Sequence, residues 1–140
     1  MDIDMAEVPG GFDGLIGLRL THADGDRVEA VVPITDKLLQ AHGIVHGGVY
    51  CAAIESVTSI GASLRAGLDH QVVGISNRTQ FHRATRSGTL SVTATLASDD
   101  SPRQLWDATV TDDGGRLVAS GQVQLMRLDP RPRGQSKSPM

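Results

Sequence analysis

The chain of 140 residues is poor in cysteine, in aromatic side chains and in net charge. Its single cysteine, Cys51, excludes an internal disulfide framework and a zinc site built from several cysteines. Aromatic residues make up only 3% of the chain, so the core must consist mainly of Val, Leu, Ile and Ala. The net charge of −3 argues against a protein that binds nucleic acid through bulk positive charge.

Long apolar segments are missing as well. No uninterrupted apolar run approaches the roughly 20 residues that a membrane-spanning helix needs, and we expect no membrane partner. The first residues carry neither the basic nor the apolar region of a signal peptide, which predicts a cytoplasmic protein. Apolar residues make up 39% of the chain and charged residues 21%, a composition typical of a folded single domain of this length.

Hydrophobic periodicity predicts one helix and six strands. Residues 1–14 are acidic and glycine-rich and are expected to form a flexible lead-in, while residues 129–140 hold three of the six prolines and are expected to be a disordered tail. The domain itself should therefore cover residues 15–128. Its elements are predicted as strands at 15–20 and 28–34, a helical turn at 36–40, a helix at 47–66, and strands at 72–81, 89–98, 104–112 and 116–128.

The predicted order is two strands, a long helix and then four strands in an antiparallel meander. A single helix can cover only one face of a six-stranded sheet. The other face or an exposed edge strand therefore needs a partner, which predicts an oligomer.

The long helix departs from the usual amphipathic pattern because it carries almost no charge. Glu55 is the only charged residue between Gly47 and Leu64. At about 100° per residue, the side expected to pack on the sheet carries Val49, Ile54, Val57, Ile60 and Leu64. The opposite side carries Gly48, Cys51, Glu55, Ser59 and Ala62. Most mid-helix glutamates are solvated surface residues, but small apolar neighbours favour a poorly solvated carboxylate that serves as a base or nucleophile.

The start of this helix contains two glycines, Gly47 and Gly48, after His46. The first N–H groups of a helix have no partner inside it, and together with the positive end of the helix dipole they can bind an anion or polarise a carbonyl. The alternative is a glycine-rich turn with no ligand, in which His46 fixes the turn by hydrogen bonds.

The spacing of these two features has a consequence for any shared chemistry. Gly47 and Glu55 are eight residues apart, which places them roughly 12 Å apart along a helix. One substrate carbonyl cannot contact both within the same chain. If both act on it, Glu55 must come from a second subunit, so the site requires a dimer.

Several stretches of the sequence resemble the hotdog-fold acyl-CoA thioesterases, with the phenylacetate-pathway and 4-hydroxybenzoyl-CoA branch the most similar. The resemblance covers roughly residues 13–128, and its most specific part is HGG followed by Glu seven residues after the second glycine. It rests on residues 40–48 (QAHGIVHGG), Glu55-Ser56, Ser59, residues 72–74 (VVG), residues 81–83 (FHR) and Gly88.

The resemblance implies an α+β hotdog fold, in which a curved antiparallel sheet of about six strands wraps around one long central helix. It also implies hydrolysis of an acyl-CoA thioester without a metal or other cofactor, by dimers that commonly pair into tetramers. The implied catalytic residues are Glu55 as nucleophile or general base, the Gly47 N–H as the group that polarises the carbonyl, and Gln40, His46 and Ser59 as their supports. Arg83, with Arg86 nearby, is implied to bind the phosphates of coenzyme A.

Two other functions remain open at this stage. A hotdog hydratase or dehydratase pairs a helix carboxylate with a histidine in a proline-containing loop, but no proline lies between Pro33 and Pro102. A non-catalytic acyl-CoA-binding protein would use the same fold.

Some apparent motifs carry little weight. His42 and His46 have the four-residue spacing of metal ligands on a helix, but the intervening glycine argues against a helix there. Cys51 has no histidine partner and is interpreted as an inert thiol. Asn77-Arg78-Thr79 fits a glycosylation pattern, which we interpret as a chance match in a chain without a secretory signal.

Overall fold

The computed structural model describes residues 10–129, and the predicted lead-in at 1–9 and tail at 130–140 lie outside the described residues. The elements are α1 (Gly11–Ile16), β1 (Arg19–Ala23), β2 (Arg27–Pro33), the 3-10 turn η1 (Asp36–Leu38), α2 (Gly47–Ala66), β3 (Val72–Phe81), β4 (Thr89–Asp100), β5 (Arg103–Thr111) and β6 (Leu117–Arg127).

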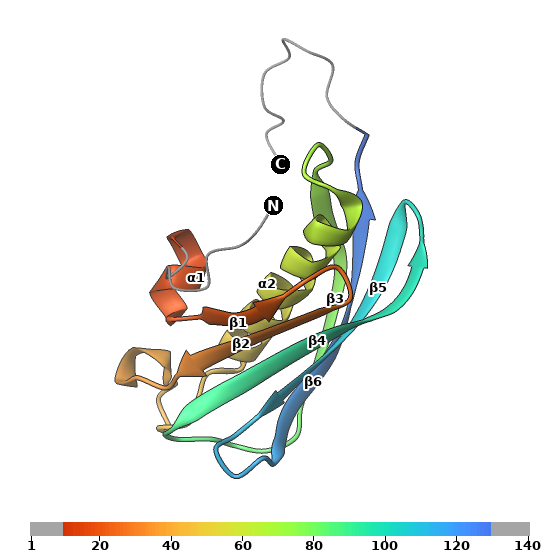
Figure 1. The fold of residues 1–140 in the computed structure, drawn as a ribbon. Coiled ribbons are helices and arrows are strands. Elements are labelled where there is room, and N and C mark those ends of the chain that lie inside the picture. Colours follow the sequence, from red (N-terminus) through yellow and green to blue (C-terminus); the bar gives the residue numbers. More distant parts are fainter. Residues whose placement is uncertain (1–9, 130–140) are drawn as a thin grey trace.

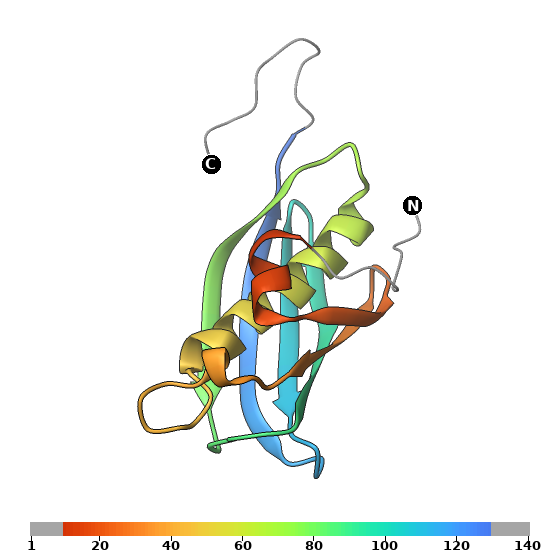
Figure 2. The same cartoon turned by 90° about the vertical axis from the view of Figure 1, so that its left-hand side faces the viewer.

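The six strands form one antiparallel sheet in the order β1-β2-β4-β5-β6-β3. Figures 1 and 2 show the sheet curving around α2, which lies in its concave side. This is the hotdog fold, so the expected fold class is confirmed. The two edges of the sheet are the short strand β1 and the ten-residue strand β3.

The order of the strands differs from the predicted meander in one respect. β4, β5 and β6 follow one another as a meander, but β3 lies beyond β6 and pairs with it, while β4 pairs with β2. The connection from β3 to β4 therefore crosses the end of the sheet. Sequence patterns show where strands form, but the pairing of distant strands depends on which faces can cover the helix.

The N-terminal region also differs from expectation. Residues 11–16 form the helix α1 where a loose lead-in and the start of a strand were predicted, and β1 begins only at Arg19. α1 ends at Gly17, whose φ of 78° lies in the left-handed region that favours glycine. The Ser56 hydroxyl of α2 donates a hydrogen bond to the Asp13 carboxylate, which holds α1 against the central helix (Figure 2).

Helix α2 begins and ends as predicted, and part of the side expected to face away from the sheet is buried as well. Ala62, expected on the side away from the sheet, is fully buried. The reason is the curvature of the sheet, because the long β4–β5 hairpin reaches over the C-terminal half of the helix. There the Gln104 side-chain amide donates a hydrogen bond of 3.3 Å to the Ala62 carbonyl.

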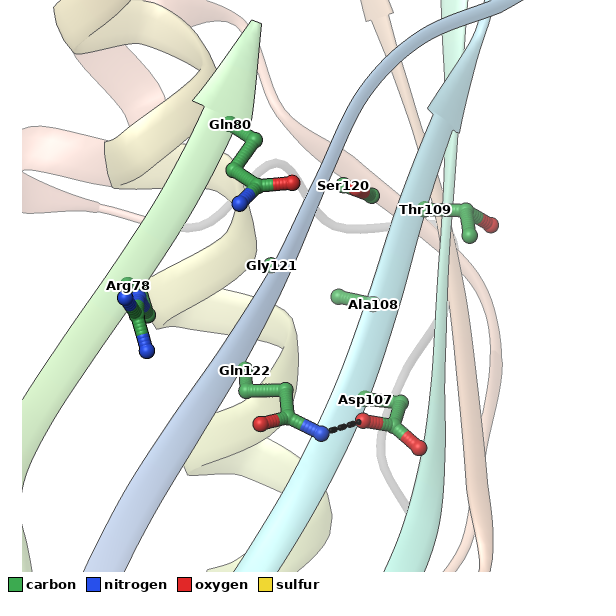
Figure 3. A pocket seen from close by; sticks show the side chains of 8 residues that line it. All are labelled: Arg78, Gln80, Asp107, Ala108, Thr109, Ser120, Gly121 and Gln122. Atoms are coloured by element: carbon green, nitrogen blue, oxygen red, sulfur yellow. Dashed lines mark hydrogen bonds between the residues drawn. The ribbon is translucent and has the colours of Figure 1, made fainter.

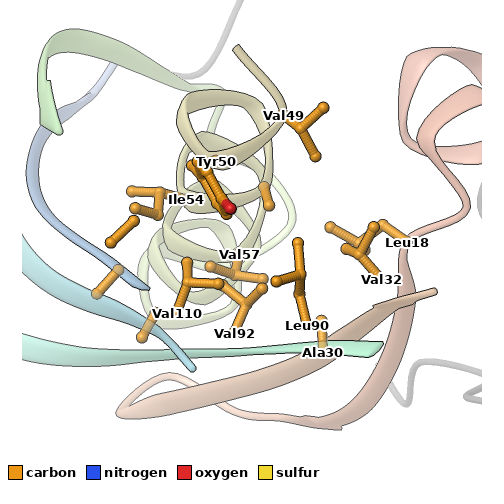
Figure 4. Close-up of a cluster of buried hydrophobic side chains, with 14 of the residues drawn as sticks. Leu18, Ala30, Val32, Val49, Tyr50, Ile54, Val57, Leu90, Val92 and Val110 are labelled. Carbon is orange, nitrogen blue, oxygen red and sulfur yellow. The ribbon is translucent and has the colours of Figure 1, made fainter. Parts of the chain in front are cut away.

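The core fills the space between α2 and the concave side of the sheet with aliphatic side chains, and Figure 4 labels Val57, Leu90 and Val92 among them. Each such side chain stabilises the fold by roughly 1.5–3 kcal/mol through its removal from water. The helix and the sheet come close together at Gly61, where a Cβ atom would lie 2.4 Å from Cη2 of the buried Trp106. A glycine is needed at this position because any side chain would displace the indole ring.

An ion-pair network fixes the C-terminal end of α2. The Arg65 Nε atom lies 2.6 Å from Asp99 Oδ2 on β4, and Arg65 Nη1 lies 3.0 Å from Asp26 Oδ1 in the β1–β2 turn. The Ser101 hydroxyl and the Arg65 guanidinium both donate hydrogen bonds to Asp99 and hold the pKa of that carboxyl below its usual value. The network joins the helix to both of the hairpins that flank it.

Candidate active site

The N-terminus of α2 is capped in a way that leaves one N–H group available. His46 is the N-cap residue, and its Nδ1 atom accepts a hydrogen bond of 2.8 Å from the Gly48 N–H. The Val49 N–H donates to the His46 carbonyl at 2.9 Å. Within residues 10–129 no acceptor lies against the Gly47 N–H, which therefore remains available to a ligand.

Gly47 lies in a cleft of about 510 Å³ between the start of α2, the loop before it and the end of β3. The cleft is lined by Gln40, Ile44, Val45, Gly47, Tyr50, Phe81, His82, Arg83 and Ala84. A Cβ atom on Gly47 would lie 3.0 Å from Cζ of Phe81, so the glycine lets this ring approach the helix backbone. The arrangement places a free N–H group beside an aromatic wall.

Gln40 supports the loop that leads into the helix. Its side-chain oxygen accepts a hydrogen bond from the His42 N–H, and its backbone carbonyl accepts one of 2.9 Å from the Gly43 N–H. Gly43 has a φ of 79°, a conformation that favours glycine. Gln40 lines the cleft together with Gly47. Its two hydrogen bonds also fix the shape of the loop.

Glu55 lies two turns further along α2 and faces β3. The Asn77 side-chain amide donates a hydrogen bond of 3.3 Å to Glu55 Oε1 and one of 3.1 Å to the Cys51 carbonyl. Asn77 is itself held by the Thr79 hydroxyl, which donates to its Oδ1 atom at 2.8 Å. Oε2 of Glu55 lies 2.5 Å from the position that a Cβ atom on Gly74 would take.

Gly74 and Asn77 lie against Glu55, but neither was predicted to take part in the site. Asn77 drew attention only as part of a glycosylation pattern, whereas in the structure its amide orients the Glu55 carboxylate. Gly74 stands where the pairing of β3 with β6 shifts register. A glycine inside a strand often marks a bulge or the close approach of another group, and that signal could have been used.

The remaining predicted residues are distributed unevenly around the site. Ser59 is half-buried on α2, and within the described part of the chain it makes no hydrogen bond to Glu55. Arg83 is exposed and lines the cleft beside Gly47. Arg86 is directed elsewhere, since its Nη1 atom donates to the His42 carbonyl at 3.2 Å.

The structure thus brings Gly47, Gln40 and Arg83 together in one cleft, but it does not bring Glu55 to that cleft. Glu55 and Gly47 lie on the same continuous helix, eight residues apart. This spacing corresponds to about 12 Å along the helix axis. Within one chain, the polarising N–H group and the carboxylate therefore belong to two separate surfaces.

A second groove, of about 500 Å³, lies on the face of the sheet that points away from α2 (Figure 3). Its lining includes Arg78 and Gln80, which alternate along β3 with the inward-facing Asn77 and Thr79. The Gln122 side chain donates a hydrogen bond of 2.8 Å to Asp107 across this groove. Its polar lining is typical of a solvated sheet face.

Residues 10–129 hold neither a cluster of metal-binding side chains nor a helix that could span a membrane. No group of three or more His, Cys, Asp or Glu side chains is placed to hold a metal ion there. Helices of the length and apolar character needed to cross a membrane are also absent from these residues. Of the two histidines with metal-ligand spacing, His42 and His46, the second has a structural role, because its Nδ1 atom caps the helix.

The hotdog fold, the glycine-rich start of its central helix and the oriented carboxylate of Glu55 are the features expected of the thioesterase class. The model of the thioesterase superfamily matches residues 42–119 of the chain. Rv1847 of Mycobacterium tuberculosis, a protein named as an esterase, is 44% identical over 124 residues that cover 86% of this chain and 89% of the relative. The chain belongs to the thioesterase superfamily, and its activity is thioester hydrolysis.

Solved structures agree with this assignment. The structure of Rv1847 has a TM-score of 0.83 at 43% identity and covers 86% of this chain and 98% of its own. The structure of AziG from S. sahachiroi has a TM-score of 0.82 at 40% identity, with coverage of 85% and 97%. Among curated relatives, the 1,4-dihydroxy-2-naphthoyl-CoA hydrolase of Escherichia coli K12 is 27% identical and covers 81% of this chain and 84% of its own.

Proposed function

We propose that the protein hydrolyses an acyl-CoA thioester to a carboxylic acid and coenzyme A, with Glu55 as the reacting carboxylate. The observation that carries this proposal is the orientation of Glu55 by the Asn77 amide in the space left by Gly74. The name of the Escherichia coli relative supports coenzyme A esters as the substrate class.

The Gly47 N–H is the group proposed to bind the thioester carbonyl oxygen. A hydrogen-bond donor at a helix N-terminus stabilises the negative charge that develops on this oxygen when the carbonyl carbon is attacked. Gln40 and His46 would keep this donor in place by fixing the loop and the cap.

Two chemical routes are open to Glu55. As a general base it takes a proton from water, whose oxygen attacks the carbonyl carbon, and the tetrahedral intermediate then expels the coenzyme A thiolate, which takes up the proton. As a nucleophile it forms an acyl anhydride with loss of the thiolate, and water then releases the acid. Both routes need the same carboxylate.

The two halves of the site meet only if Glu55 comes from a second copy of the chain. The strand beside Glu55, β3, is an edge strand of ten residues, and most of its residues are exposed. An edge of this length is a template for pairing with another strand. We propose a homodimer formed along β3, with two equivalent sites and the predicted tetramer as a pair of such dimers.

Coenzyme A would extend from the thioester toward Arg83 at the mouth of the cleft. The exposed guanidinium of Arg83 can bind a phosphate by charge-assisted hydrogen bonds. Arg86 is a weaker candidate for this role, because it already donates to the His42 carbonyl.

The substitution Glu55→Gln tests the proposed catalytic role. It keeps the size and the contact with Asn77 but removes the base, so kcat should fall by at least roughly a hundredfold. Coenzyme A release from a panel of acyl-CoA esters measures the rate, and a thermal melt checks that the variant folds. Binding of the ester should persist, because Gly47 and Arg83 are unchanged.

The matched control is Glu29→Gln on β2, which alters a glutamate that pairs with Arg27 and lies outside the cleft lining. This control should keep its wild-type turnover. Wild-type turnover in Glu55→Gln would contradict the catalytic role. A wild-type protein that binds the esters without hydrolysing any of them would favour an acyl-CoA-binding protein instead.

A further inference from the structure

The side chain that orients Glu55 belongs to an exposed residue on an edge strand. Asn77 lies on β3, where an exposed amide is free to turn toward water. It instead donates to two acceptors on α2, Glu55 Oε1 at 3.3 Å and the Cys51 carbonyl at 3.1 Å. Holding a side chain in one rotamer costs conformational entropy, so a third contact that restricts the amide stabilises both of these hydrogen bonds.

Thr79 supplies that third contact. Its hydroxyl donates a hydrogen bond of 2.8 Å to Asn77 Oδ1, while the NH₂ group of the same amide donates to both acceptors on α2. With the amide turned over, its oxygen would face the Glu55 carboxylate and the Cys51 carbonyl, neither of which can donate a hydrogen bond. The three contacts together therefore select one orientation of Asn77.

The Thr79 hydroxyl is well placed to fix its neighbour, because Thr79 has little freedom of its own. It is half-buried and pairs with Gly121 of β6. A Cβ atom on Gly121 would lie 3.1 Å from Thr79 Oγ1, so the hydroxyl lies close to the backbone of the adjacent strand. The branch at Cβ further restricts the side-chain rotamers of threonine. Thr79 is therefore the rigid member of the pair.

The contact with Asn77 occupies one oxygen of the Glu55 carboxylate and leaves the other one available. Oε1 accepts the hydrogen bond from Asn77, whereas Oε2 has no hydrogen-bond partner within residues 10–129 and lies over Gly74. An oxygen with free lone pairs can take a proton from water or attack a carbonyl carbon. Fixing Oε1 thus fixes the direction of the oxygen that remains for the reaction.

We propose that Thr79 is a positioning residue for thioester hydrolysis, which acts through Asn77 to hold the Glu55 carboxylate with Oε2 free to react. The proposal rests on the proposed function and adds to it a residue that does not touch the carboxylate. Small misplacements of a reacting group lower the rate of the chemical step more than they weaken substrate binding. Loss of the Thr79 hydroxyl should therefore appear in kcat rather than in KM.

Thr79→Val removes the hydroxyl and keeps the shape of the side chain. We expect kcat for acyl-CoA esters to fall by about fivefold or more and KM to stay within about twofold, since the substrate contacts are unchanged. Thr79→Ser keeps the hydroxyl and should retain kcat within about threefold of the wild type. The control is Thr109→Val, the same change at an exposed position on the outer face of the sheet, which should alter neither constant.

A double variant shows whether Thr79 acts through Asn77. In an Asn77→Ala background the amide is gone, so adding Thr79→Val should lower kcat by less than about twofold more, as expected for residues of one network. Thermal melts check that all variants are folded. A double variant whose kcat falls by the product of the two single losses would overturn the proposal, and so would wild-type kcat in Thr79→Val.

Nuclear magnetic resonance of the Asn77 side-chain amide gives a readout that needs no catalysis. Its NH₂ signals, identified by their absence in Asn77→Ala, should show a rigid group in the wild type and in Thr79→Ser and a mobile group in Thr79→Val. An amide that stays rigid in Thr79→Val would also overturn the proposal.

The same measurements separate this proposal from the proposed function. Wild-type turnover in Glu55→Gln, together with an amide that becomes mobile in Thr79→Val, would contradict the proposed function and support the contact between Thr79 and Asn77. A large loss of turnover in Glu55→Gln, together with wild-type kcat in Thr79→Val, would contradict the positioning role alone.

Discussion

Two glycines shape the site at the scale of single residues. Gly47 lets the ring of Phe81 lie against the helix start, and Gly74 leaves the space that the carboxylate of Glu55 occupies. In both cases a hydrogen atom stands where a methyl group would meet the neighbouring side chain. The reactive groups are therefore positioned by missing side chains as much as by hydrogen bonds.

The substitution Gly74→Ala should lower kcat by about tenfold or more, because the new methyl group displaces the Glu55 carboxylate and a small misplacement of a reacting group is costly. The melting temperature should change little, since the methyl group meets the movable end of a side chain rather than backbone. Steady-state kinetics and a thermal melt measure the two effects.

The comparison variant for this prediction is Ser76→Ala, an exposed position on the same strand. It adds no atoms toward Glu55 and should keep both its rate and its stability. If Gly74→Ala has the wild-type kcat, the position of the carboxylate against β3 is not the reactive one.

At the scale of elements, the connection between β3 and β4 carries two arginines with different surroundings. Arg83 leaves β3 at the mouth of the cleft, and its N–H donates to the Val118 carbonyl at 3.3 Å, which fixes the backbone while the side chain stays exposed. Arg86 bridges to the loop before α2. One arginine is free to bind a phosphate, while the other joins two loops.

The substitution Arg83→Ala should raise KM for acyl-CoA esters by about fivefold to tenfold and change kcat by less than about twofold. A phosphate anchor far from the reacting carbon stabilises the ground state and the transition state equally. Arg86→Ala should instead lower the melting temperature, because it loses the hydrogen bonds to the His42 and Gly43 carbonyls. An unchanged KM in Arg83→Ala would place the phosphate site elsewhere.

Elements fixed by local signals were predicted accurately from the sequence, and those fixed by distant contacts were not. Helix α2 was found from Gly47 to Ala66 because its glycine-rich start and the following Gly67 are local features. Helix α1 was missed, since six residues with glycines at both ends have little helical propensity of their own. The contact of Asp13 with Ser56, 43 residues away, stabilises it.

The same distinction applies to the candidate site. The sequence pointed to Glu55 and Gly47 because each stands out within its own helix. It could not show that Asn77 orients Glu55, because that contact depends on where β3 lies in the sheet. The predicted meander placed β3 next to β4, which was wrong, because β3 lies beyond β6.

At the scale of the whole molecule, the proposed site requires that two chains share their parts. Strand β3 forms ladder hydrogen bonds with β6 on one side only, and Ile75 on it is 43% exposed. The opposite edge, β1, has five residues and a register shift, which makes it a poorer template for pairing. Light scattering in dilute buffer should therefore show a dimer or a tetramer.

Mixing two inactive variants tests whether the site is shared. Glu55→Gln lacks the carboxylate, and Gly47→Pro lacks the polarising N–H. Proline at the first helical position removes no helix hydrogen bond, although its ring must displace the side chain of Phe81. In an equal mixture with random pairing, one of the two sites in each mixed dimer is intact, so about a quarter of the wild-type activity should return.

The subunits are exchanged by unfolding the mixture and refolding it. In the comparison experiment, each variant is unfolded and refolded alone in the same way. No activity should return there. If the unlike mixture also stays inactive while light scattering and thermal melts show folded mixed dimers, the carbonyl and the carboxylate do not meet across the subunits.

The close contact between Gly61 and Trp106 has a practical consequence. Trp106 is the only tryptophan of the chain, and it is fully buried against the central helix. Its indole N–H donates to Gln104, and Gln104 in turn donates to the helix backbone at Ala62. The tryptophan emission of the protein therefore comes from a single indole at the junction of helix and sheet, and it reports, without any label, whether the helix is packed on the sheet.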